Sequence, residues 1–498
     1  MFASVAITAI VVIAVYVWQW RRRICNRFRS IPGPPGLPLV GNTHMFIGKS
    51  STYVFNLALE LEREYGCVYK LDVMFDFWLF YCAAEDVERI MTGPEFNCKG
   101  QDYDMLLEWL GTGLLISNGN KWFTHRKALT PAFHFKILDN FVPVFNDKST
   151  VLARKFLKHS GKVVHVFPLV KLCTLDVIVE TAMGTESNAQ EEESGYTMAV
   201  EHVSEIIFWR MFDAVYNNDF MFKFSSKFRP YKKYLTTIRE FTMSIITKRK
   251  NALVDKSGEN LPIDDALLGS KRKMALLDVL MRTNIDGQPL TDEEIREEVD
   301  TFMFAGHDTT ASAVTFILFA LAKHPDVQQK VYQEVIAVFG ESINTSITLS
   351  ALNDLKYLDL VIKEALRMYP PVPFISRKTI KEVDLSGTTI PIGSNITIGI
   401  YNMHHNPKYF PEPEKFLPER FEAERGIEKR NPYAYVPFSA GGRNCIGQKF
   451  AQYEVKSTIS NIMRHCRVEL PHPDYELPLK VEMILKPQDD MPLIFYPR

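Results

Sequence analysis

Residues 438–447 read Phe-Ser-Ala-Gly-Gly-Arg-Asn-Cys-Ile-Gly, and an amphipathic helix is predicted directly after them, over residues 448–466. A cysteine before a helix meets the positive end of the helix dipole and free backbone N–H groups, which favour the thiolate at Cys445. Gly441, Gly442 and Gly447 remove side chains around this sulfur, as a broad, flat group lying against the backbone would require. Arg443 could bind a carboxylate on such a group. The alternative interpretation is a glycine-rich loop that carries an ordinary core cysteine.

A second informative stretch is the long helix predicted from Thr291 to His324, which Pro325 ends. Its first residues, Thr-Asp-Glu-Glu at 291–294, form a capping box. Its middle, residues 305–310, reads Ala-Gly-His-Asp-Thr-Thr. A glycine, an acid and hydroxyls all weaken a helix interior, so we expect these residues to serve function. His307 among them is interpreted as a hydrogen-bonded core residue rather than a metal ligand.

The composition is that of an ordinary globular protein. Of the 498 residues, 46% are hydrophobic and 23% charged, which excludes a disordered, collagenous or coiled-coil chain. Lys and Arg number 58 against 59 Asp and Glu, so no overall field exists to hold nucleic acid. The seven cysteines lack any Cys-x-x-Cys spacing, which argues against a disulfide framework, a structural zinc site and an iron-sulfur cluster.

The amino-terminal residues 1–20 are predicted to be a transmembrane signal anchor. They are almost wholly apolar, about the length that a helix needs to cross a bilayer, and Arg residues follow at 21–23, which favours a cytosolic body. A cleaved signal peptide is the alternative, but the bulky Val-Trp-Gln-Trp at 17–20 offers no cleavage site. Residues 21–38 form a basic and proline-rich hinge, with a disordered linker as the alternative. Glycosylation at the Asn344 or Asn395 sequon would overturn this orientation.

Residues 39–498 are predicted to form one compact domain that is mainly α-helical with small β-sheets. Helical periodicity dominates, and short alternating segments at 67–73 and 387–398 are typical of strands. The hydrophilic stretches 184–195 and 255–273 are predicted to be surface loops.

These motifs resemble those of the cytochromes P-450. The haem-binding signature of that family, Phe-x-x-Gly-x-Arg-x-Cys-x-Gly, is complete at residues 438–447. Trp122 and Arg126 match its propionate-binding pair, and residues 305–310 match its oxygen-activating motif. The marks appear in the family's order, so the resemblance covers essentially the whole chain.

The resemblance also implies a buried ion triad, formed here by Glu364, Arg367 and Arg420. Adjacent charges on a helix usually form a weak exposed pair, yet the apolar neighbours of Glu364 make burial plausible. We assign the triad to folding and haem retention rather than to catalysis.

Within the superfamily, the sequence around residues 298–310 looks like that of the fatty-acid ω-hydroxylases, family four. Residues 121–122 and 129–135 support the same branch. That branch commonly has a glutamate, ester-linked to the haem, where this chain has Ala305. Alanine cannot form the ester, so non-covalent haem b and a less strict selectivity for the terminal carbon are expected.

The resemblance implies the cytochrome P-450 fold, with haem between the long central helix and the cysteine loop. Cys445 is expected to ligate the iron, and Asp308 and Thr309 to deliver protons to iron-bound oxygen. The other residues expected to contact haem are Trp122, Arg126, Arg443, Phe438, Gly441, Ala305 and Gly306. The apolar residues expected to line the substrate pocket are Leu106, Trp109, Leu114, Phe302, Val372 and Phe374.

The implied function is a monooxygenase that inserts one oxygen atom from O2 into C–H bonds of fatty acids or related lipophilic substrates. Electrons must come from a partner, because the chain has no dinucleotide or flavin fingerprint. The resemblance implies NADPH-cytochrome P-450 reductase, with cytochrome b5 as a second candidate, at the endoplasmic reticulum membrane. The basic residues considered for docking are Lys127, Lys136, Lys449 and Lys456. A haem-thiolate isomerase or dehydratase acting on peroxides and a non-catalytic haem-binding sensor are the competing functions.

Overall fold

The computed structural model describes residues 27–498 except 39, 74–75, 134, 193–194, 255–274, 286, 342–346 and 423–429, together with positions 8, 12, 15, 16 and 19. Most of the predicted anchor, the run 21–26, the whole predicted loop 255–273 and the Asn344 sequon therefore lie outside the described residues.

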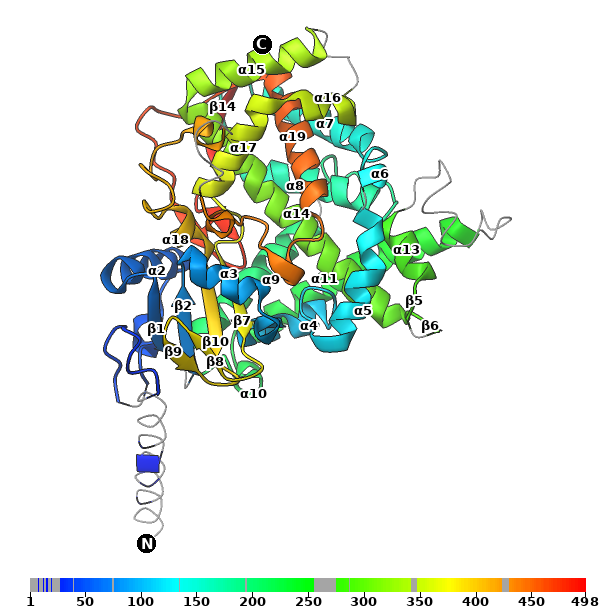
Figure 1. Cartoon of the computed structure of the whole chain (residues 1–498). Coiled ribbons are helices and arrows are strands. Elements are labelled where there is room, and N and C mark those ends of the chain that lie inside the picture. Colours follow the sequence, from blue (N-terminus) through cyan, green and yellow to red (C-terminus); the bar gives the residue numbers. More distant parts are fainter. Residues whose placement is uncertain are drawn as a thin grey trace.

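Helices form most of the body, as the sequence predicts (Figure 1). The helices are α2 (Ser51–Tyr65), α3 (Ala84–Thr92), α4 (Leu107–Leu110), α5 (Gly119–Leu129), α6 (Phe135–Leu138), α7 (Val142–Lys158), α8 (Val166–Thr181), α9 (Gly195–Phe212), α10 (Asp219–Phe222), α11 (Phe228–Val254), α13 (Leu276–Arg282), α14 (Asp292–Lys323), α15 (Pro325–Phe339), α16 (Leu349–Asp354), α17 (Lys356–Met368), α18 (Ile400–His404) and α19 (Gln448–His465). Short 3₁₀ turns include η5 (Pro418–Phe421) and η9 (Gly441–Arg443).

The predicted long helix is α14, and it passes through the middle of the helical body (Figure 1). Thr291 caps it by accepting a hydrogen bond from the Glu294 N–H, and the Glu294 side chain accepts one from the Thr291 N–H, which confirms the capping box. The helix packs against α8, α11, α17 and α19 and is buried over most of its length. Within the described residues it is the helix long and apolar enough to span a membrane, yet 83% of its apolar window is buried inside the body.

The strands form small sheets at several places around the helical body, and the largest of them lies at one end of it (Figure 1). The strands are β1 (Val68–Val73), β2 (Asp76–Tyr81), β3 (Cys98–Lys99), β4 (Val163–His165), β5 (Asn284–Ile285), β6 (Gln288–Pro289), β7 (Phe374–Lys378), β8 (Val383–Leu385), β9 (Thr388–Ile390), β10 (Asn395–Gly399), β11 (Cys466–Glu469), β12 (Leu479–Val481), β13 (Leu485–Pro487) and β14 (Pro492–Pro497). The largest sheet has the order β1-β2-β10-β7-β3, with β10 parallel to β2 and the other pairs antiparallel. A second sheet has the order β11-β14-β4, and β12–β13, β5–β6 and β8–β9 are two-stranded.

Two strand predictions are tested directly. The segment 67–73 forms β1, as predicted. The single strand predicted over 387–398 is wrong, because Gly393, at φ 83°, forms a turn that divides it into β9 and β10. Asn395 begins β10 and is buried, so its sequon is not accessible to glycosylation and provides no test of topology.

The proline-rich segment packs against the body and is hydrogen-bonded to it. The Lys70 N–H in β1 donates to the Pro32 carbonyl at 2.9 Å, and the Asn42 amide donates to the carbonyls of Pro34 and Pro35. Phe28 and Ile31 just before it are buried against the sheet. Residues 27–38 therefore fix the direction in which the chain leaves the body.

The ion triad predicted from the sequence is formed and buried. The Arg367 guanidinium donates two hydrogen bonds to Glu364 at 2.8 and 2.9 Å, and Arg420 Nε donates to the same carboxylate at 2.9 Å. Arg367 also donates to the backbone carbonyls of His404 and Pro413. Because every partner is buried, the loss of one charge would leave another uncompensated. The triad joins α17 to the segment that leads toward residue 438.

Candidate functional site

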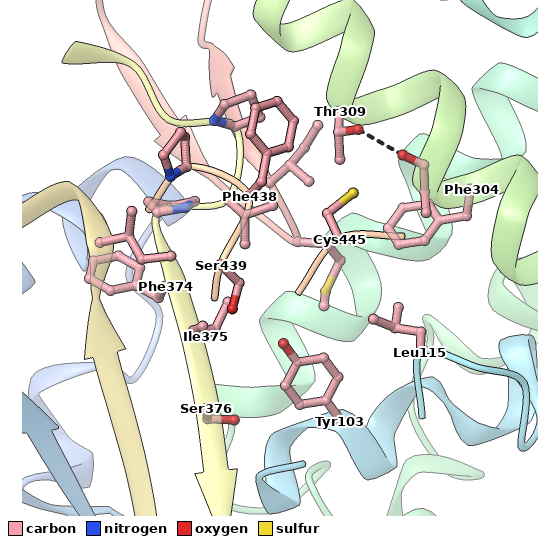
Figure 2. A pocket seen from close by; sticks show the side chains of 18 of the residues that line it. Tyr103, Leu115, Phe304, Thr309, Phe374, Ile375, Ser376, Phe438, Ser439 and Cys445 are labelled. Carbon is pink, nitrogen blue, oxygen red and sulfur yellow. Dashed lines mark hydrogen bonds between the residues drawn. The ribbon is translucent and has the colours of Figure 1, made fainter. Parts of the chain in front are cut away.

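A cavity of about 430 Å³ lies between α14, the loop before α19 and the end of β7 (Figure 2). Its walls are mostly apolar. Cys445 lines one wall, and its side chain is open to the cavity. Ala305 and Thr309 of α14 line the cavity as well. The two stretches that the sequence marks as functional thus meet around one space.

The loop 438–447 holds its cysteine through backbone geometry. The Cys445 N–H donates to the Phe438 carbonyl at 2.9 Å, which closes the loop. Gly441 has φ 67°, and a Cβ added there would lie 2.0 Å from the Met91 carbonyl oxygen. This position therefore requires glycine for both its backbone conformation and its close approach to α3. At Gly442 and Gly447 the nearest atoms would be in ordinary contact, so these two glycines leave space instead.

The surroundings of the Cys445 sulfur act on its ionisation in opposite directions. Burial raises the pKa of the thiol above its ordinary value, while the Gly447 N–H and the Arg126 charge act in the opposite direction without overcoming it. A cation bound at the sulfur would favour the thiolate that the sequence predicts.

Trp122, Arg126 and Arg443 come together beside the cysteine loop. The Arg443 guanidinium lies over the Trp122 ring, 4.1 Å from its centroid. Arg126 donates to the Asn444 carbonyl at 2.9 Å and to its side-chain oxygen at 2.6 Å. Arg443 donates to the carbonyls of Asn97 and Ser117 and to the Asn118 side chain, all of them neutral acceptors.

Two further cations, Lys99 and Arg377, make this region strongly positive. Burial and the neighbouring charge of Arg377 lower the pKa of Arg443 to about 10. Burial, with Arg377 and Arg443 beside it, holds the pKa of Lys99 well below its usual range. Asp102 is the acid that opposes this charge. The cluster is therefore a site for an added anion.

The sequence reasoning missed Lys99 and Arg377. The signal was an arginine inside an otherwise apolar strand, Phe-Ile-Ser-Arg-Lys at 374–378, which is uncommon unless the charge has a partner. It also missed Glu454 of α19, a fully buried carboxyl beside the Thr310 hydroxyl.

These residues fit haem b. A buried nitrogen of Arg443, Nη1, has no hydrogen-bond partner in the described structure, and the positive cluster around it suits the carboxylates of a porphyrin. The Cys445 sulfur lies within the same cavity and is a soft ligand for iron. Gly442 leaves open space next to Trp122. Phe438 also lines the cavity, as predicted.

The α14 wall presents Ala305 and Thr309 to the cavity (Figure 2). The Thr309 hydroxyl donates to the Ala305 carbonyl at 2.7 Å. Gly306 lines the cavity too, but a Cβ added there would lie 2.6 Å from Ile178 Cδ1 of α8. Gly306 therefore serves the close packing of two helices. His307 is buried and its Nδ1 hydrogen bonds the Met303 carbonyl, which agrees with a core residue.

Asp308 lies on another side of α14 and does not line the cavity. Its carboxylate faces Lys486 Nζ of β13 at 3.4 Å, and both side chains are buried. Burial alone would raise its pKa, yet the charges of Lys486 and His307 hold the pKa of Asp308 below its ordinary value. Lys486 also contacts Glu482 at 3.2 Å. Asp308 is thus an ionised group joined to a buried network next to the cavity wall.

Most of the predicted pocket residues line the cavity, and one does not. The prediction for Trp109 is wrong, because the residue is fully buried and its ring packs against that of Phe304, with 4.6 Å between the ring centroids. The predicted residues that do line the cavity are Leu106, Leu114, Phe302, Val372 and Phe374. Sequence reasoning did not identify the following lining residues: Phe46, Trp78, Phe80, Phe212, Met483 and Ile484. They come from segments far apart in the chain, which no local pattern connects.

The predicted basic residues divide in the same way. Lys127 and Lys449 are exposed. The prediction of Lys456 as a docking residue is wrong, because its side chain is buried and its Nζ lies 3.2 Å from Asp359 Oδ1. The side chain of Lys136 lies outside the described structure.

Comparison with known proteins agrees with this geometry. The family model described as Cytochrome P450 matches residues 31–495. Among curated proteins, the chain is 42% identical over 465 residues to cytochrome P450 4d2 of Drosophila melanogaster, covering 92% of each chain. It is 38% identical over 500 residues to cytochrome P450 4c3 of the same fly, covering 98% of this chain and 93% of the relative. For cytochrome P450 4c21 of Blattella germanica, the identity is 37% over 500 residues, covering 99% and 98%.

The fold has close solved counterparts. The crystal structure of a mutant cytochrome P450DA heme domain superimposes with a TM-score of 0.80 over 94% of this chain and 98% of that chain, at 23% identity. At this identity the likeness concerns the fold. The curated relatives are family 4 enzymes by name. Because the family match and these relatives each cover nearly the whole chain, the chain belongs to the cytochrome P450 family and is a monooxygenase that holds haem b without a covalent bond.

Proposed function

We propose that this monooxygenase hydroxylates fatty acids or related lipophilic molecules. We propose that it takes NADPH-derived electrons from NADPH-cytochrome P450 reductase, with cytochrome b5 as a second candidate donor. The observation that carries the substrate class is the apolar lining of the cavity that opens onto Cys445. A long alkyl chain gains free energy by burial there, and water is excluded from the reacting carbon. Likeness to family 4 relatives supports the same class.

The haem iron, with a cysteine thiolate ligand and two electrons, supplies the oxygen activation that no side chain can perform. The chain's residues bind and orient. We assign Cys445 as the iron ligand and Arg443, Trp122 and Arg126 as partners of the haem carboxylates. Phe438 and Gly441 shape the loop, and Ala305 and Gly306 belong to the opposite wall.

We further assign proton delivery to Thr309 and Asp308. Thr309 Oγ1 lies at the cavity wall and holds its proton against the Ala305 carbonyl. A small rotation would turn that proton toward the cavity. Asp308 is one helical position away and is ionised beside Lys486, so it would accept a proton from this buried network or from water before passing it to the Thr309 hydroxyl.

Replacement of Thr309 by Ala tests this assignment. The variant should consume NADPH at a rate similar to that of the wild type while forming several-fold less hydroxylated product and more hydrogen peroxide. The measurement is the ratio of product to NADPH consumed, with Thr309→Ser as the control that restores the hydroxyl. Unchanged coupling in Thr309→Ala would remove the assignment of proton delivery to this hydroxyl.

The substrate class is tested by binding spectra with fatty acids of graded chain length, their methyl esters, sterols and xenobiotics, followed by product analysis. Fatty acids should bind and be hydroxylated. Because Ala305 provides no carboxyl for a haem ester, we expect both terminal and in-chain products. Turnover of sterols or xenobiotics alone would contradict the proposal.

We also propose a single-pass anchor over residues 1–20, a hinge over 21–38 and a catalytic domain over 39–498 that faces the cytosol at the endoplasmic reticulum. The described positions Val12, Val15 and Tyr16 are helical and expose their side chains, which supports contact with lipid. Phe220 of α10 and Phe224 just after it are exposed as well, by 64% and 70%. Removal of residues 1–20 should reduce membrane retention of the expressed protein in a fractionation experiment.

A further inference from the structure

Two cysteines outside the haem site face one another at the end of the β1–β2 pair. Cys67 precedes β1 and Cys82 follows β2, one place beyond the paired residues Val68 and Tyr81. The Cys82 N–H donates to the Cys67 carbonyl at 3.0 Å, so the two residues lie directly opposite across the antiparallel pair. Residues opposite one another in such a pair have Cα atoms about 4.5–5.5 Å apart, within the range that a disulfide spans.

The sulfur atoms are also close. Cys67 Sγ, Cys82 Sγ and a carboxylate oxygen of Glu62 all lie within 4.8 Å of one another. The sulfur of Cys67 accepts a hydrogen bond from the Asn406 amide at 3.4 Å, and the Cys82 thiol donates to Glu62 Oε1 at 3.8 Å. Cys67 is half-buried, whereas Cys82 is 3% exposed. One thiol is therefore accessible, and the second lies directly behind it.

We propose that Cys67 and Cys82 form a peroxide-sensitive dithiol that closes reversibly into a disulfide. Uncoupled turnover of a monooxygenase releases hydrogen peroxide, which supplies the oxidant. Neither cysteine has a role in the haem site.

The two thiols differ in the way that such a reaction requires. The neighbouring Cys82 thiol lowers the pKa of Cys67, and Asn406 and the charge of Lys408 act in the same direction, against burial and the charge of Glu62. The pKa of Cys82 is raised by Cys67 and by burial. The accessible sulfur is thus the better nucleophile, and the buried one keeps the proton.

The chemistry balances with peroxide alone. The Cys67 thiolate attacks one peroxide oxygen, an S–O bond forms, the O–O bond breaks, and the leaving hydroxide takes a proton to become water. The Cys82 sulfur then attacks the sulfenic sulfur of Cys67, an S–S bond forms, the S–O bond breaks, and a second water leaves. Glu62 accepts the Cys82 proton and passes it to the leaving hydroxide, which departs as that water. The two thiols are oxidised by two electrons and the peroxide is reduced to two waters.

The bond would join the ends of a strand pair that forms part of the substrate cavity. Leu71 of β1 and Trp78 and Phe80 of β2 line the cavity. A covalent link restricts separation of the two strands and lowers the conformational entropy of the unfolded chain. The oxidised protein should therefore be the more stable form.

The test is treatment of the purified holoenzyme with one equivalent of hydrogen peroxide, followed by non-reducing peptide mapping. We expect a Cys67–Cys82 linked peptide, the loss of two titratable thiols and of the mass of two hydrogen atoms, and complete reversal by dithiothreitol. The oxidised form should also have a higher apparent melting temperature. Persistence of both thiols, or oxidation of Cys67 to sulfinic acid without a link, would overturn the proposal.

Variants separate the two roles. In Cys82→Ser, Cys67 should accumulate as a sulfenic acid that dimedone captures, whereas Cys67→Ser should yield neither the link nor the captured acid. Cys98→Ser, a substitution elsewhere in the chain, should leave the link intact. Zinc that co-purifies in equimolar amount and protects both thiols from peroxide would assign the three ligands to a metal ion and overturn the disulfide.

Discussion

At the scale of single residues, the buried carboxyl group of Glu454 makes the stability of the fold depend on pH. Its carboxyl group is buried in α19 beside Thr310, and burial raises its pKa well above the usual range. In an unfolded chain such a carboxyl ionises at about pH 4.3, whereas in the folded chain burial favours the protonated form to higher pH. Stability therefore falls as the pH rises above that value, by about 1.4 kcal/mol per pH unit until the folded pKa is reached.

Replacement of Glu454 by Gln removes the ionisation and keeps the shape. We expect the variant to have a higher apparent melting temperature than the wild type at pH 8, and the difference to shrink toward pH 5. Glu88→Gln, at an exposed position, is the matched control and should show no such pH dependence. A Glu454→Gln difference that is constant with pH would show that the carboxyl is ionised in the folded protein.

Gly441 and Gly442 are neighbours, but they differ in whether an alanine side chain would fit at the position. Alanine at Gly441 would meet the Met91 carbonyl oxygen at 2.0 Å and adopt φ 67°, whereas alanine at Gly442 would meet its nearest atom, in Trp122, at 3.7 Å. We expect Gly441→Ala to lose most haem incorporation and to cost more than about 1 kcal/mol. Gly442→Ala should fold and should reduce haem content less. The measurement is the ratio of haem to protein after purification, and equal losses would contradict the backbone explanation.

At the scale of elements, the contact between α14 and α8 depends on Gly306. A Cβ there would overlap Ile178 of α8, so Gly306→Ala should cost about 1–3 kcal/mol through overpacking. The cost should be smaller in an Ile178→Ala background, because the overlapping atoms are gone. Thermal unfolding of the four proteins in this cycle measures the coupling. Additive effects would mean that Gly306 acts through the cavity rather than through helix packing.

Elements were predictable where their signal is local. The capping box at Thr291 marks the start of α14, and Pro325 marks its end, because both act on the nearest turn of backbone. The haem loop was readable for the same reason. The turn at Gly393 that divides 387–398 also has a local signal, Pro391 and Gly393, but the alternation of apolar residues around it favoured one continuous strand. Lys456 was misassigned because its partner, Asp359, lies on another helix.

At the scale of the whole molecule, the site is a meeting of distant segments. The cavity combines residues from β1–β2, α14, β7 and the loop before α19. The sequence marks the segments that carry chemistry, since their residue types are costly elsewhere. It does not mark the apolar walls, since a Phe that lines a cavity and a Phe that fills a core have the same local pattern. For this reason Trp109, which was predicted to line the cavity, lies in the core, and Phe46, which no pattern marked, lines the cavity.

Electron delivery is also a property of the whole surface. Lys449 is exposed at the start of α19, next to the Cys445 loop, where the proposed reductase would approach the haem by a short path. Replacement of Lys449 by Glu reverses one charge without touching a buried contact. We expect reduction by the reductase to slow by about tenfold at low salt, and the difference to diminish as salt screens the charges.

Lys162 provides the matched control for this prediction. It is exposed and precedes β4, in the sheet that α19 reaches at its other end, so Lys162→Glu makes the same charge change far from the cysteine loop. Stopped-flow reduction of both variants over a range of ionic strength separates a local docking effect from a change in net charge. Equal slowing by the two variants would place the effect in the overall charge, and no slowing at Lys449 would move the docking surface away from the start of α19.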